Sequence, residues 1–221
     1  MVVSRVFVHK ACWMAMLTVL IALMTQVAVA SGAEQTAQAS LEQLYDDLLG
    51  ELEARKGEIL KDRALLDEVS ERIIEPHIDF LRMSKLVMGR YWRKMSEDEQ
   101  AYYAEYMRRK ISTAMIKLYD PDKELKVEFL GARVSPKGNK SIVQTRWQAG
   151  DNAQIYAVDY RLRLNDAQWM VYDVSVDGIS VLQSYKTAVS DEIESTSLER
   201  YMASLEDEVD VKRRTAAGVM K

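Results

Sequence analysis

The stretch W-M-V-Y-D-V-S-V-D-G-I-S-V-L-Q-S-Y, residues 169–185, indicates the fold of the second half of the chain. Its first eight residues alternate with the period of two that a β-strand has, which places the even-numbered residues from Met170 to Val176 on one apolar face. The period changes at Gly178, and the apolar residues from Ile179 onward have the spacing of a helix. The stretch therefore predicts an apolar strand that runs directly into a helix.

Three similar segments precede this strand, at residues 123–134, 140–148 and 153–164. The sequences between the four segments, P-K-G-N, A-G-D-N and N-D-A-Q, are typical of turns, and such short connections join antiparallel neighbours. The sequence therefore predicts a four-stranded antiparallel meander.

The first half of the chain has apolar residues at helical spacing. Asp62 is placed to cap a helix that Pro76 ends, and Asp79 is placed to cap the next one. S-E-D-E at residues 96–99 is a capping box, in which the Ser and Glu side chains satisfy each other's free backbone amides, and it predicts the start of a long helix. Together with the helices after Gly178, these elements predict an α+β fold, with a curved sheet covered on one face by amphipathic helices.

The two ends of the chain have distinct compositions. Arg5 and Lys10 precede an apolar run, and A-V-A at residues 28–30 is typical of a signal-peptidase site, so a cleaved signal peptide is predicted, with an uncleaved anchor as the alternative. Cleavage removes Cys12, the only cysteine, and leaves no disulfide. The predicted organisation is a signal peptide at 1–30, one domain at 31–209 (helical 34–119, sheet 123–177, closing helices 179–209) and a disordered basic tail at 210–221.

Charge and residue content argue against several functions. The formal net charge is −4, which argues against binding to nucleic acid and tight binding to anionic membranes. The predicted mature chain has one histidine, His77, and no cysteine, so no metal site is expected. Asp173 and Asp177 lie about 13 Å apart on an extended strand, beyond the reach of paired glycosidase acids. Asp159 and Asp173 are interpreted as cross-strand partners of arginines, and no catalytic residue is predicted.

The apolar sheet face and the helices above it allow two arrangements. Such elements form an ordinary filled core in most proteins, but a concave sheet under long helices can also enclose a chamber for an apolar ligand. The periodicity of the sequence does not separate the two.

Three segments resemble a known family. I-D-F-L-R-M-S-K-L-V-M-G-R-Y-W-R (residues 78–93), A-V-D-Y-R-L-R-L-N (157–165) and W-M-V-Y-D-V-S-V-D-G-I-S (169–180) are similar to the periplasmic phospholipid-binding proteins of the maintenance-of-lipid-asymmetry (Mla) pathway, the MlaC or toluene-tolerance auxiliary (Ttg2) family. The resemblance covers nearly all of the predicted mature chain. It implies an NTF2-like or cystatin-like sheet with a helical lobe, enclosing a lipid chamber.

The resemblance also implies a function. The protein is expected to be a monomer in the periplasm of a Gram-negative bacterium, with phospholipid as cargo and no cofactor. Its expected partners are an outer-membrane lipoprotein and porin complex and an inner-membrane ABC transporter with an MCE-type lipid-binding subunit. The alternatives are a periplasmic chaperone for apolar clients and an NTF2-like enzyme acting on an apolar substrate through Asp159, Asp173 or His77.

Two sets of site residues follow from this expectation. The acyl tails are expected to contact apolar side chains of the helices predicted after Asp79 and after Ser96, of the sheet and of the turn after it, namely Leu86, Val87, Tyr91, Met107, Ile111, Met115, Tyr156, Val158, Tyr160, Val174, Val176, Ile179 and Leu182. Docking to partner proteins is assigned to cations on the opposite strand faces, Arg146, Arg161 and Arg163.

Overall fold

The structure is a computed structural model that describes residues 36–150 and 153–205. In chain order, its elements are a first helix at 36–54, α2 (Lys56–Ile59), α3 (Leu65–Val69), the π-helix η1 (Ser70–Ile74), the 3₁₀ helix η2 (Glu75–His77), α4 (Phe80–Met88), the 3₁₀ helix η3 (Gly89–Lys94), α5 (Glu97–Leu118), β1 (Leu125–Val134), β2 (Lys140–Ala149), β3 (Ile155–Asn165), β4 (Gln168–Val176), β5 (Ile179–Ser180), α6 (Val181–Ser195) and a last helix at 198–205. The predicted signal peptide and basic tail lie outside the described residues.

The α+β prediction is confirmed. One antiparallel sheet has the strand order β1-β2-β3-β4-β5, so each strand pairs with its neighbours in the sequence. The short β5 was not predicted: Asp177 and Gly178, both with positive φ, turn the chain back so that Ile179 pairs with Val176. The helix that was expected from Ile179 consequently begins two residues later, as α6, with Ser180 as its N-cap.

A β-bulge changes which residues of β4 share a face. Tyr160 of β3 pairs with Val174, but Leu162 pairs with Val171, so Tyr172 is an extra residue in β4. One extra residue reverses the alternation of faces beyond it. The prediction that the even-numbered residues share one face along the whole strand is therefore wrong for the part of β4 before the bulge.

Trp169 and Val171 consequently face the same core as Val174. Met170, which pairs with Arg163, lies on the other face. The sequence does not decide whether the odd-numbered or the even-numbered residues of this part of β4 face the core. Residues 169–172 are all apolar or aromatic, so both arrangements fit a buried strand.

Two helix starts follow the prediction. Asp79 caps α4 by accepting a hydrogen bond from the backbone amide of Arg82 at 2.9 Å. At the start of α5, the amide of Glu99 donates to Ser96 Oγ at 3.2 Å and the amide of Ser96 donates to the Glu99 carboxylate at 2.7 Å, which completes the capping box. Within the described ranges, none of the helices combines the length and the apolar character needed to cross a bilayer.

The cap predicted at Asp62 is wrong. The N-cap of α3 is Ala64, which provides no side-chain hydrogen bond. Asp62 instead accepts a hydrogen bond from the amide of Ala64 at 3.0 Å, in the turn before the helix. Asp side chains commonly form such a hydrogen bond to the backbone amide two residues ahead, as in an Asx-turn. The chain then continues without interruption through the π-helix η1 into η2, where Pro76 lies in the first turn.

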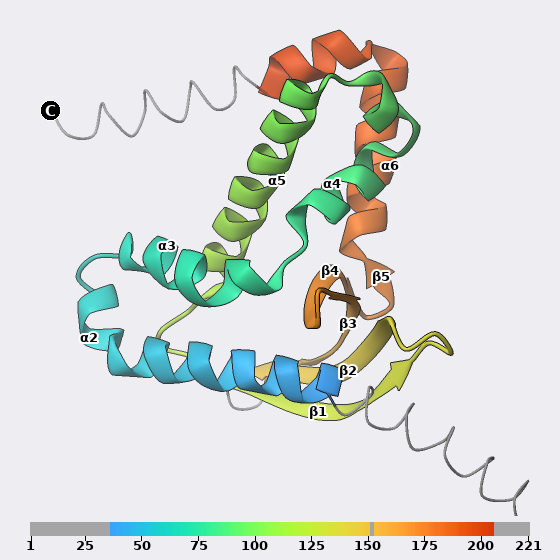
Figure 1. Cartoon of the computed structure of the whole chain (residues 1–221). Helices are drawn as coiled ribbons and strands as arrows, with labels where there is room; N and C mark the ends of the chain where they lie inside the picture. Colours follow the sequence, from blue (N-terminus) through green and yellow to red (C-terminus); the bar gives the residue numbers. More distant parts are fainter. Residues whose placement is uncertain (1–35, 151–152, 206–221) are drawn as a thin grey trace, which may run out of the picture.

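Apolar side chains form two buried clusters, and Figure 1 shows the two parts of the molecule that hold them. The sheet cluster joins the first helix to one face of the sheet and contains Ala37, Leu41, Leu44, Tyr45, Ala132, Val143, Val158, Tyr160, Leu162, Trp169 and Val171. The helical cluster joins α4, η3, α5, α6 and the last helix through Val87, Met88, Tyr91, Trp92, Met95, Tyr103, Tyr106, Met107, Val189, Ile193, Tyr201, Met202 and Leu205. The first helix covers the sheet, and α4, η3, α5, α6 and the last helix form a separate lobe, whereas α2 and α3 lie beside the first helix (Figure 1).

Candidate functional site

The residues predicted to line a lipid chamber are divided between the two clusters. Val87, Tyr91 and Met107 are buried in the helical cluster, with Ile111 and Leu182 packed against it. Val158 and Tyr160 are buried in the sheet cluster, with Val174 packed against it. Leu86 and Met115 are half-buried and belong to neither cluster, whereas Tyr156, Val176 and Ile179 are exposed. Lipid contact by these thirteen residues stays a prediction, because this arrangement does not test it.

The middle of the sheet face is packed against the first helix. The hydroxyls of Tyr45 and Tyr160 lie 2.5 Å apart, and the Tyr45 ring meets the rings of Phe129 and Trp147 edge-on, each at 5.8 Å between centroids. Burial raises the pKa of both tyrosines above the ordinary value. Around Tyr160, the sheet face is therefore a filled aromatic core.

The same face of the sheet is uncovered at the end that contains Tyr156, Val176 and Ile179. Trp147 pairs with Tyr156 across β2 and β3, and Val176 pairs with Ile179 across β4 and β5. Tyr156 and Val176 are about four-tenths exposed, and Ile179 is 68% exposed. Ile155 and Val181 are large exposed side chains in the same region of the chain. Because exposing aliphatic and aromatic side chains together is unfavourable in water, this end of the sheet is the candidate functional site.

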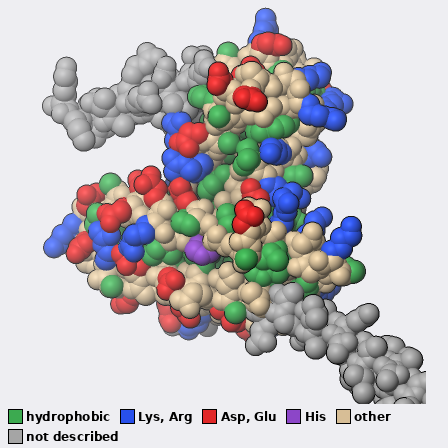
Figure 2. All heavy atoms as spheres, viewed as in Figure 1, with side chains coloured by type: hydrophobic (Ala, Val, Ile, Leu, Met, Phe, Trp, Pro, Cys, Tyr) green, Lys and Arg blue, Asp and Glu red, His purple; other side chains and the backbone are tan. Residues whose placement is uncertain are grey.

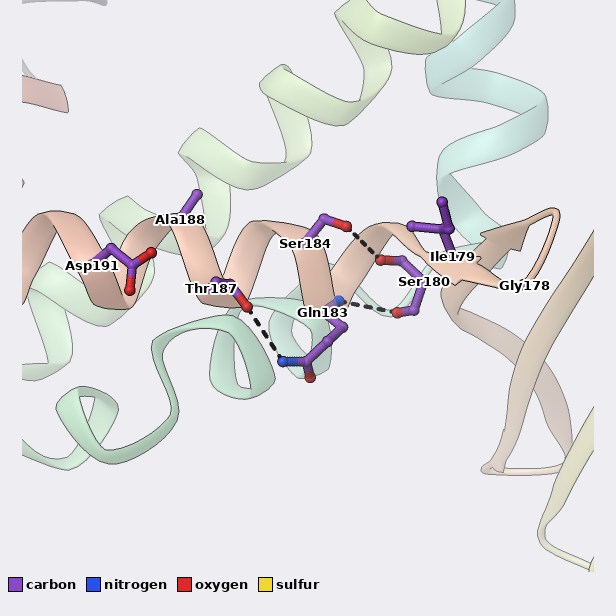
Figure 3. Close-up of a pocket in the computed structure, with 8 residues that line it drawn as sticks. All are labelled: Gly178, Ile179, Ser180, Gln183, Ser184, Thr187, Ala188 and Asp191. Carbon is purple, nitrogen blue, oxygen red and sulfur yellow. Dashed lines mark hydrogen bonds between the residues drawn. The ribbon is translucent and has the colours of Figure 1, made fainter.

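A hollow of about 580 Å³ begins at Ile179 and follows one side of α6 (Figure 3). Apart from Ile179, most of its lining is polar or small: Gly178, Ser180, Gln183, Ser184, Thr187, Ala188 and Asp191. Several hydroxyls are used within the helix, as Ser184 Oγ donates to the Ser180 carbonyl at 2.9 Å and Gln183 Nε2 donates to Thr187 Oγ1 at 3.5 Å. Ile179 thus belongs both to the uncovered apolar end of the sheet and to a polar hollow beside it.

The opposite face of the sheet is joined to α6 by a buried carboxylate. Asp173, which is 4% exposed, accepts hydrogen bonds from Arg161 Nη1 at 2.5 Å, Ser180 Oγ at 2.8 Å and the backbone amide of Leu182 at 3.1 Å. Arg161 also donates to Ser175 Oγ at 3.1 Å. The interpretation of Asp173 as the partner of an arginine is confirmed, and the contact also fixes the start of α6.

The three arginines assigned to docking differ in their contacts. Arg161 is held by Asp173, and Arg146 pairs with Glu128 at 3.3 Å across β1 and β2. Within the described parts of the chain, Arg163 forms no ion pair, and neither does Asp159. The interpretation of Asp159 as the partner of an arginine is therefore wrong, because its neighbours in register are Gln144 and Ser175. A docking role stays a prediction for all three arginines, and Arg163 is the one whose charge has no partner among the residues that the structure describes.

The residues of the alternative enzyme hypothesis do not converge. His77 Nδ1 is hydrogen-bonded to the backbone carbonyl of Ile73 at 3.0 Å and lines a hollow of about 270 Å³ with Asp47, Glu51 and Arg72. Asp173 is used by the contact to α6. Over residues 36–150 and 153–205, no three His, Cys, Asp or Glu side chains are grouped so that they could hold a metal ion.

The prediction from sequence did not identify several residues of this region. Trp147, Ile155 and Val181 border the uncovered end of the sheet, and Tyr45 lies within the packed part. The alternation of β2 and the helical stripe that contains Tyr45 mark these residues as apolar, but only the position of the first helix on the sheet shows which of them remain uncovered.

An α+β protein whose apolar sheet face is covered at one end and open at the other belongs to the class that can hold an apolar ligand. A family model, described as MlaC protein, matches residues 42–207. The match spans most of the chain, so the chain belongs to the MlaC family.

Two known proteins are similar to this chain. The toluene tolerance protein ttg2D of Pseudomonas putida is 24% identical over 177 residues, which cover 78% of this chain and 80% of that protein. A phospholipid-binding protein from Ralstonia solanacearum, solved in complex with a phospholipid, superposes with a TM-score of 0.61 at 21% identity and covers 77% of this chain and 98% of that one. The structural likeness confirms the fold.

Proposed function

We propose that this chain is a periplasmic phospholipid carrier, which moves lipid between an outer-membrane lipoprotein complex and an inner-membrane ABC transporter and so maintains the lipid asymmetry of the outer membrane. The observation that carries the proposal is the uncovered apolar end of the sheet at Tyr156, Val176 and Ile179. Membership of the MlaC family and the phospholipid bound by the Ralstonia protein support the same ligand class.

The energetics of an acyl tail explain why a carrier needs such a surface. Each buried methylene contributes about 0.8 kcal/mol, so a sixteen-carbon tail represents roughly 12 kcal/mol of apolar transfer. A water-filled groove does not compensate for leaving the bilayer, and the tail must be enclosed by apolar side chains. The three exposed side chains alone are too few to enclose it.

Loading therefore includes a change in packing. Tails that first contact Ile179 and Val176 meet Val158, Tyr160 and Val174 farther along the same face, where the first helix covers the sheet. These side chains exchange contacts with the first helix for contacts with methylenes. The exchange conserves most of the apolar burial, so a protein that is well packed when empty can still accept a tail.

The head group remains in water beside the tail. The hollow along α6 begins at Ile179 and offers the side-chain amide of Gln183 and the hydroxyl of Thr187, whereas the Ser180 hydroxyl already donates to Asp173. Such neutral groups hydrogen-bond to phosphate without selecting one head group. We expect the carrier to accept phospholipids with little discrimination between head groups.

Organic extraction of the purified protein, followed by mass spectrometry, tests this function. We expect close to one phospholipid per protein, with a head-group distribution similar to that of the host membranes. Protein that is emptied in detergent and then incubated with vesicles should regain its lipid. A well-folded protein that carries no lipid and takes none from vesicles is not a lipid carrier, and such a result favours the chaperone hypothesis.

A further inference from the structure

The segment from residue 80 to residue 96, which forms α4 and η3, has five cations and no carboxylate. This composition stands out in a chain whose formal net charge is −4. The five cations are Arg82, Lys85, Arg90, Arg93 and Lys94. Lys186 of α6 adjoins them, since a Cβ built on Gly89 would lie 3.7 Å from Lys186 Cε. We call these six residues the basic strip.

Aromatic rings support most of these cations. The distances from the charged group to the ring centroid are 4.9 Å for Arg82 over Tyr172, 5.9 Å for Lys85 over Trp92, 4.9 Å for Arg90 over Tyr91 and 5.6 Å for Lys94 over Tyr91. A cation over a ring is attracted by the quadrupole of the ring but keeps its full charge. The strip is therefore held in position without being neutralised.

Few carboxylates offset the strip. Among the described residues, Arg90 is the strip cation that forms an ion pair, with Glu194 at 2.7 Å, and both side chains are more than half exposed. Glu199 of the last helix interacts electrostatically with Lys94. The acidic first turn of α5 borders the strip, but its Glu99 is engaged in the capping box. Lys85, Arg93 and Lys186 form no ion pair with any carboxylate of residues 36–150 and 153–205.

Helix geometry aligns the strip. Arg82 and Lys85 are three residues apart in α4 and lie on neighbouring positions of its surface. Arg90 and Arg93 are three residues apart in the 3₁₀ helix η3, where such residues eclipse each other along one edge. Figure 2 shows Lys and Arg side chains recurring along the right-hand side of the molecule, with fewer Asp and Glu side chains beside them than at the lower left, where both signs are mixed.

We propose that the basic strip is the surface through which this protein docks onto an acidic face of a partner protein. The proposal rests on the proposed function, because a carrier must bind the complexes that load and unload it. Arginine and lysine held in place beforehand lose less side-chain entropy when they pair, and the planar guanidinium of arginine matches the two oxygens of a carboxylate. Charge attraction of this kind raises the rate of association.

The strip fits a protein surface better than a membrane surface. Binding to a bilayer uses exposed aromatic or aliphatic side chains as anchors, together with cations. Here Tyr91 and Trp92 are only 7% and 8% exposed, because they support the cations from inside the helical cluster, and Leu81, 49% exposed, is the single large exposed apolar side chain of residues 80–96, too little for a membrane anchor. An anionic membrane also repels the net negative charge of the whole chain.

Binding of poly-L-glutamate to the full-length mature protein tests the proposal, in parallel with vesicles of phosphatidylglycerol and phosphatidylcholine. We expect wild type to bind poly-L-glutamate at low salt and to lose affinity by about tenfold as salt rises to roughly 0.15 M. The double variant Lys85→Glu/Arg93→Glu should bind at least about fivefold more weakly than wild type. The matched control is Arg133→Glu/Lys137→Glu, which makes the same charge change at two exposed residues of β1 and the turn after it and should stay within about twofold of wild type.

Two results would overturn the proposal. Equal weakening in the strip variant and the control would assign binding to net charge alone. Binding to anionic vesicles without binding to poly-L-glutamate would make the strip a membrane-contact surface. The lipid content of the same preparations is measured separately, so a protein without lipid refutes the carrier function but leaves the result for the strip unchanged.

Discussion

Asp173 of β4 and Arg161 of β3 face each other across the sheet, with 2.5 Å between Oδ2 and Nη1. The same carboxylate accepts hydrogen bonds from the hydroxyl of Ser180 and the backbone amide of Leu182, at the beginning of α6. One buried side chain therefore holds the β3–β4 pair and the first turn of α6 in a fixed relation. This relation sets the position of Ile179, which lies between β4 and α6.

Replacing Asp173 should destabilise the protein strongly. Asp173→Ala leaves the Arg161 guanidinium and the amide of Leu182 without their partner, and we expect the free energy of unfolding to fall by about 3 kcal/mol. The value lies at the low end of the range for broken buried pairs because the Arg161 side chain is 38% exposed and water can solvate it. Urea denaturation followed by circular dichroism measures the change.

Asp159→Ala is the matched control for this prediction. Asp159 lies on the neighbouring strand, half-buried, and forms no ion pair among the described residues. We expect it to change the free energy of unfolding by less than about 1 kcal/mol. Equal effects of the two substitutions would contradict the assignment of Asp173 as the link between the sheet and α6.

The sequence predicts those parts of this fold that depend on local chemistry. The capping box at Ser96 and Glu99 requires only neighbouring residues, and the β1–β2 and β3–β4 turns contain their own residues with positive φ, Gly138 and Asp166. The bulge at Tyr172 is different, because residues 169–172 satisfy either alternation, and only the packing of the first helix on the sheet selects one.

The site was predictable only in part, for a related reason. Apolar periodicity identifies Val158, Tyr160 and Ile179 as residues that avoid water, and all three are treated alike by that criterion. The structure buries the first two under the first helix and leaves Ile179 exposed. Which segment covers which end of a sheet depends on contacts between elements far apart in the chain, and single-sequence patterns do not contain that information.

The uncovered end of the sheet gives a prediction about lipid loading. Ile179→Glu places a carboxylate where acyl tails are proposed to enter, and burying that charge among methylenes is unfavourable. We expect the equilibrium loading from vesicles to fall at least about tenfold, since a penalty of about 1.4 kcal/mol suffices for that factor. Ile179 is 68% exposed, so the substitution should leave the fold and the circular dichroism spectrum intact.

Leu130→Glu provides the comparison for Ile179→Glu. Leu130 is 46% exposed on β1, so the same carboxylate is introduced on a large exposed aliphatic residue of a different strand. We expect Leu130→Glu to load lipid as wild type does. Unchanged loading in the Ile179 variant, or equal loss in both variants, would place the entry of the tails elsewhere.

Buried tyrosines of the helical cluster should make the protein sensitive to alkali. Burial, opposed by the hydrogen bond from Tyr103, raises the pKa of Tyr201 to about 12, and burial also raises the pKa of Tyr103. A tyrosine whose pKa is higher in the folded state than in the unfolded state stabilises the fold. This contribution is complete below the pKa of the unfolded state, about 10, and is lost as the pH rises through the pKa of the folded state. We expect the free energy of unfolding to decrease between about pH 10 and pH 12, by at most about 1.4 kcal/mol per pH unit for each tyrosine.

Tyrosinate absorbance and circular dichroism, recorded during the same alkaline titration, measure this effect. The part of the absorbance change that comes from the buried tyrosines should coincide with the loss of the circular dichroism signal, because their ionisation requires unfolding. Tyr201→Phe should make the decrease of stability with pH shallower, whereas Tyr156→Phe should leave it unchanged, since Tyr156 is exposed. Ionisation of all tyrosines near pH 10 without unfolding would contradict the burial of Tyr201.

The contact between Tyr45 and Tyr160 gives a prediction about how the first helix is held on the sheet. Their hydroxyls lie 2.5 Å apart in the sheet cluster, so Tyr160→Phe leaves the Tyr45 hydroxyl buried without this partner, at a cost of about 1 to 2 kcal/mol in the free energy of unfolding. The double variant Tyr45→Phe/Tyr160→Phe removes both polar groups and keeps both rings. Its loss of stability should therefore be smaller than the sum of the two single losses, and urea denaturation of the four proteins gives the coupling energy.

The same variants should load lipid faster than wild type, because tails displace the first helix from this part of the face in the proposed loading step. Additive stability losses would show that the hydroxyls do not interact, and an unchanged loading rate in a destabilised variant would show that the first helix stays on the sheet while lipid enters.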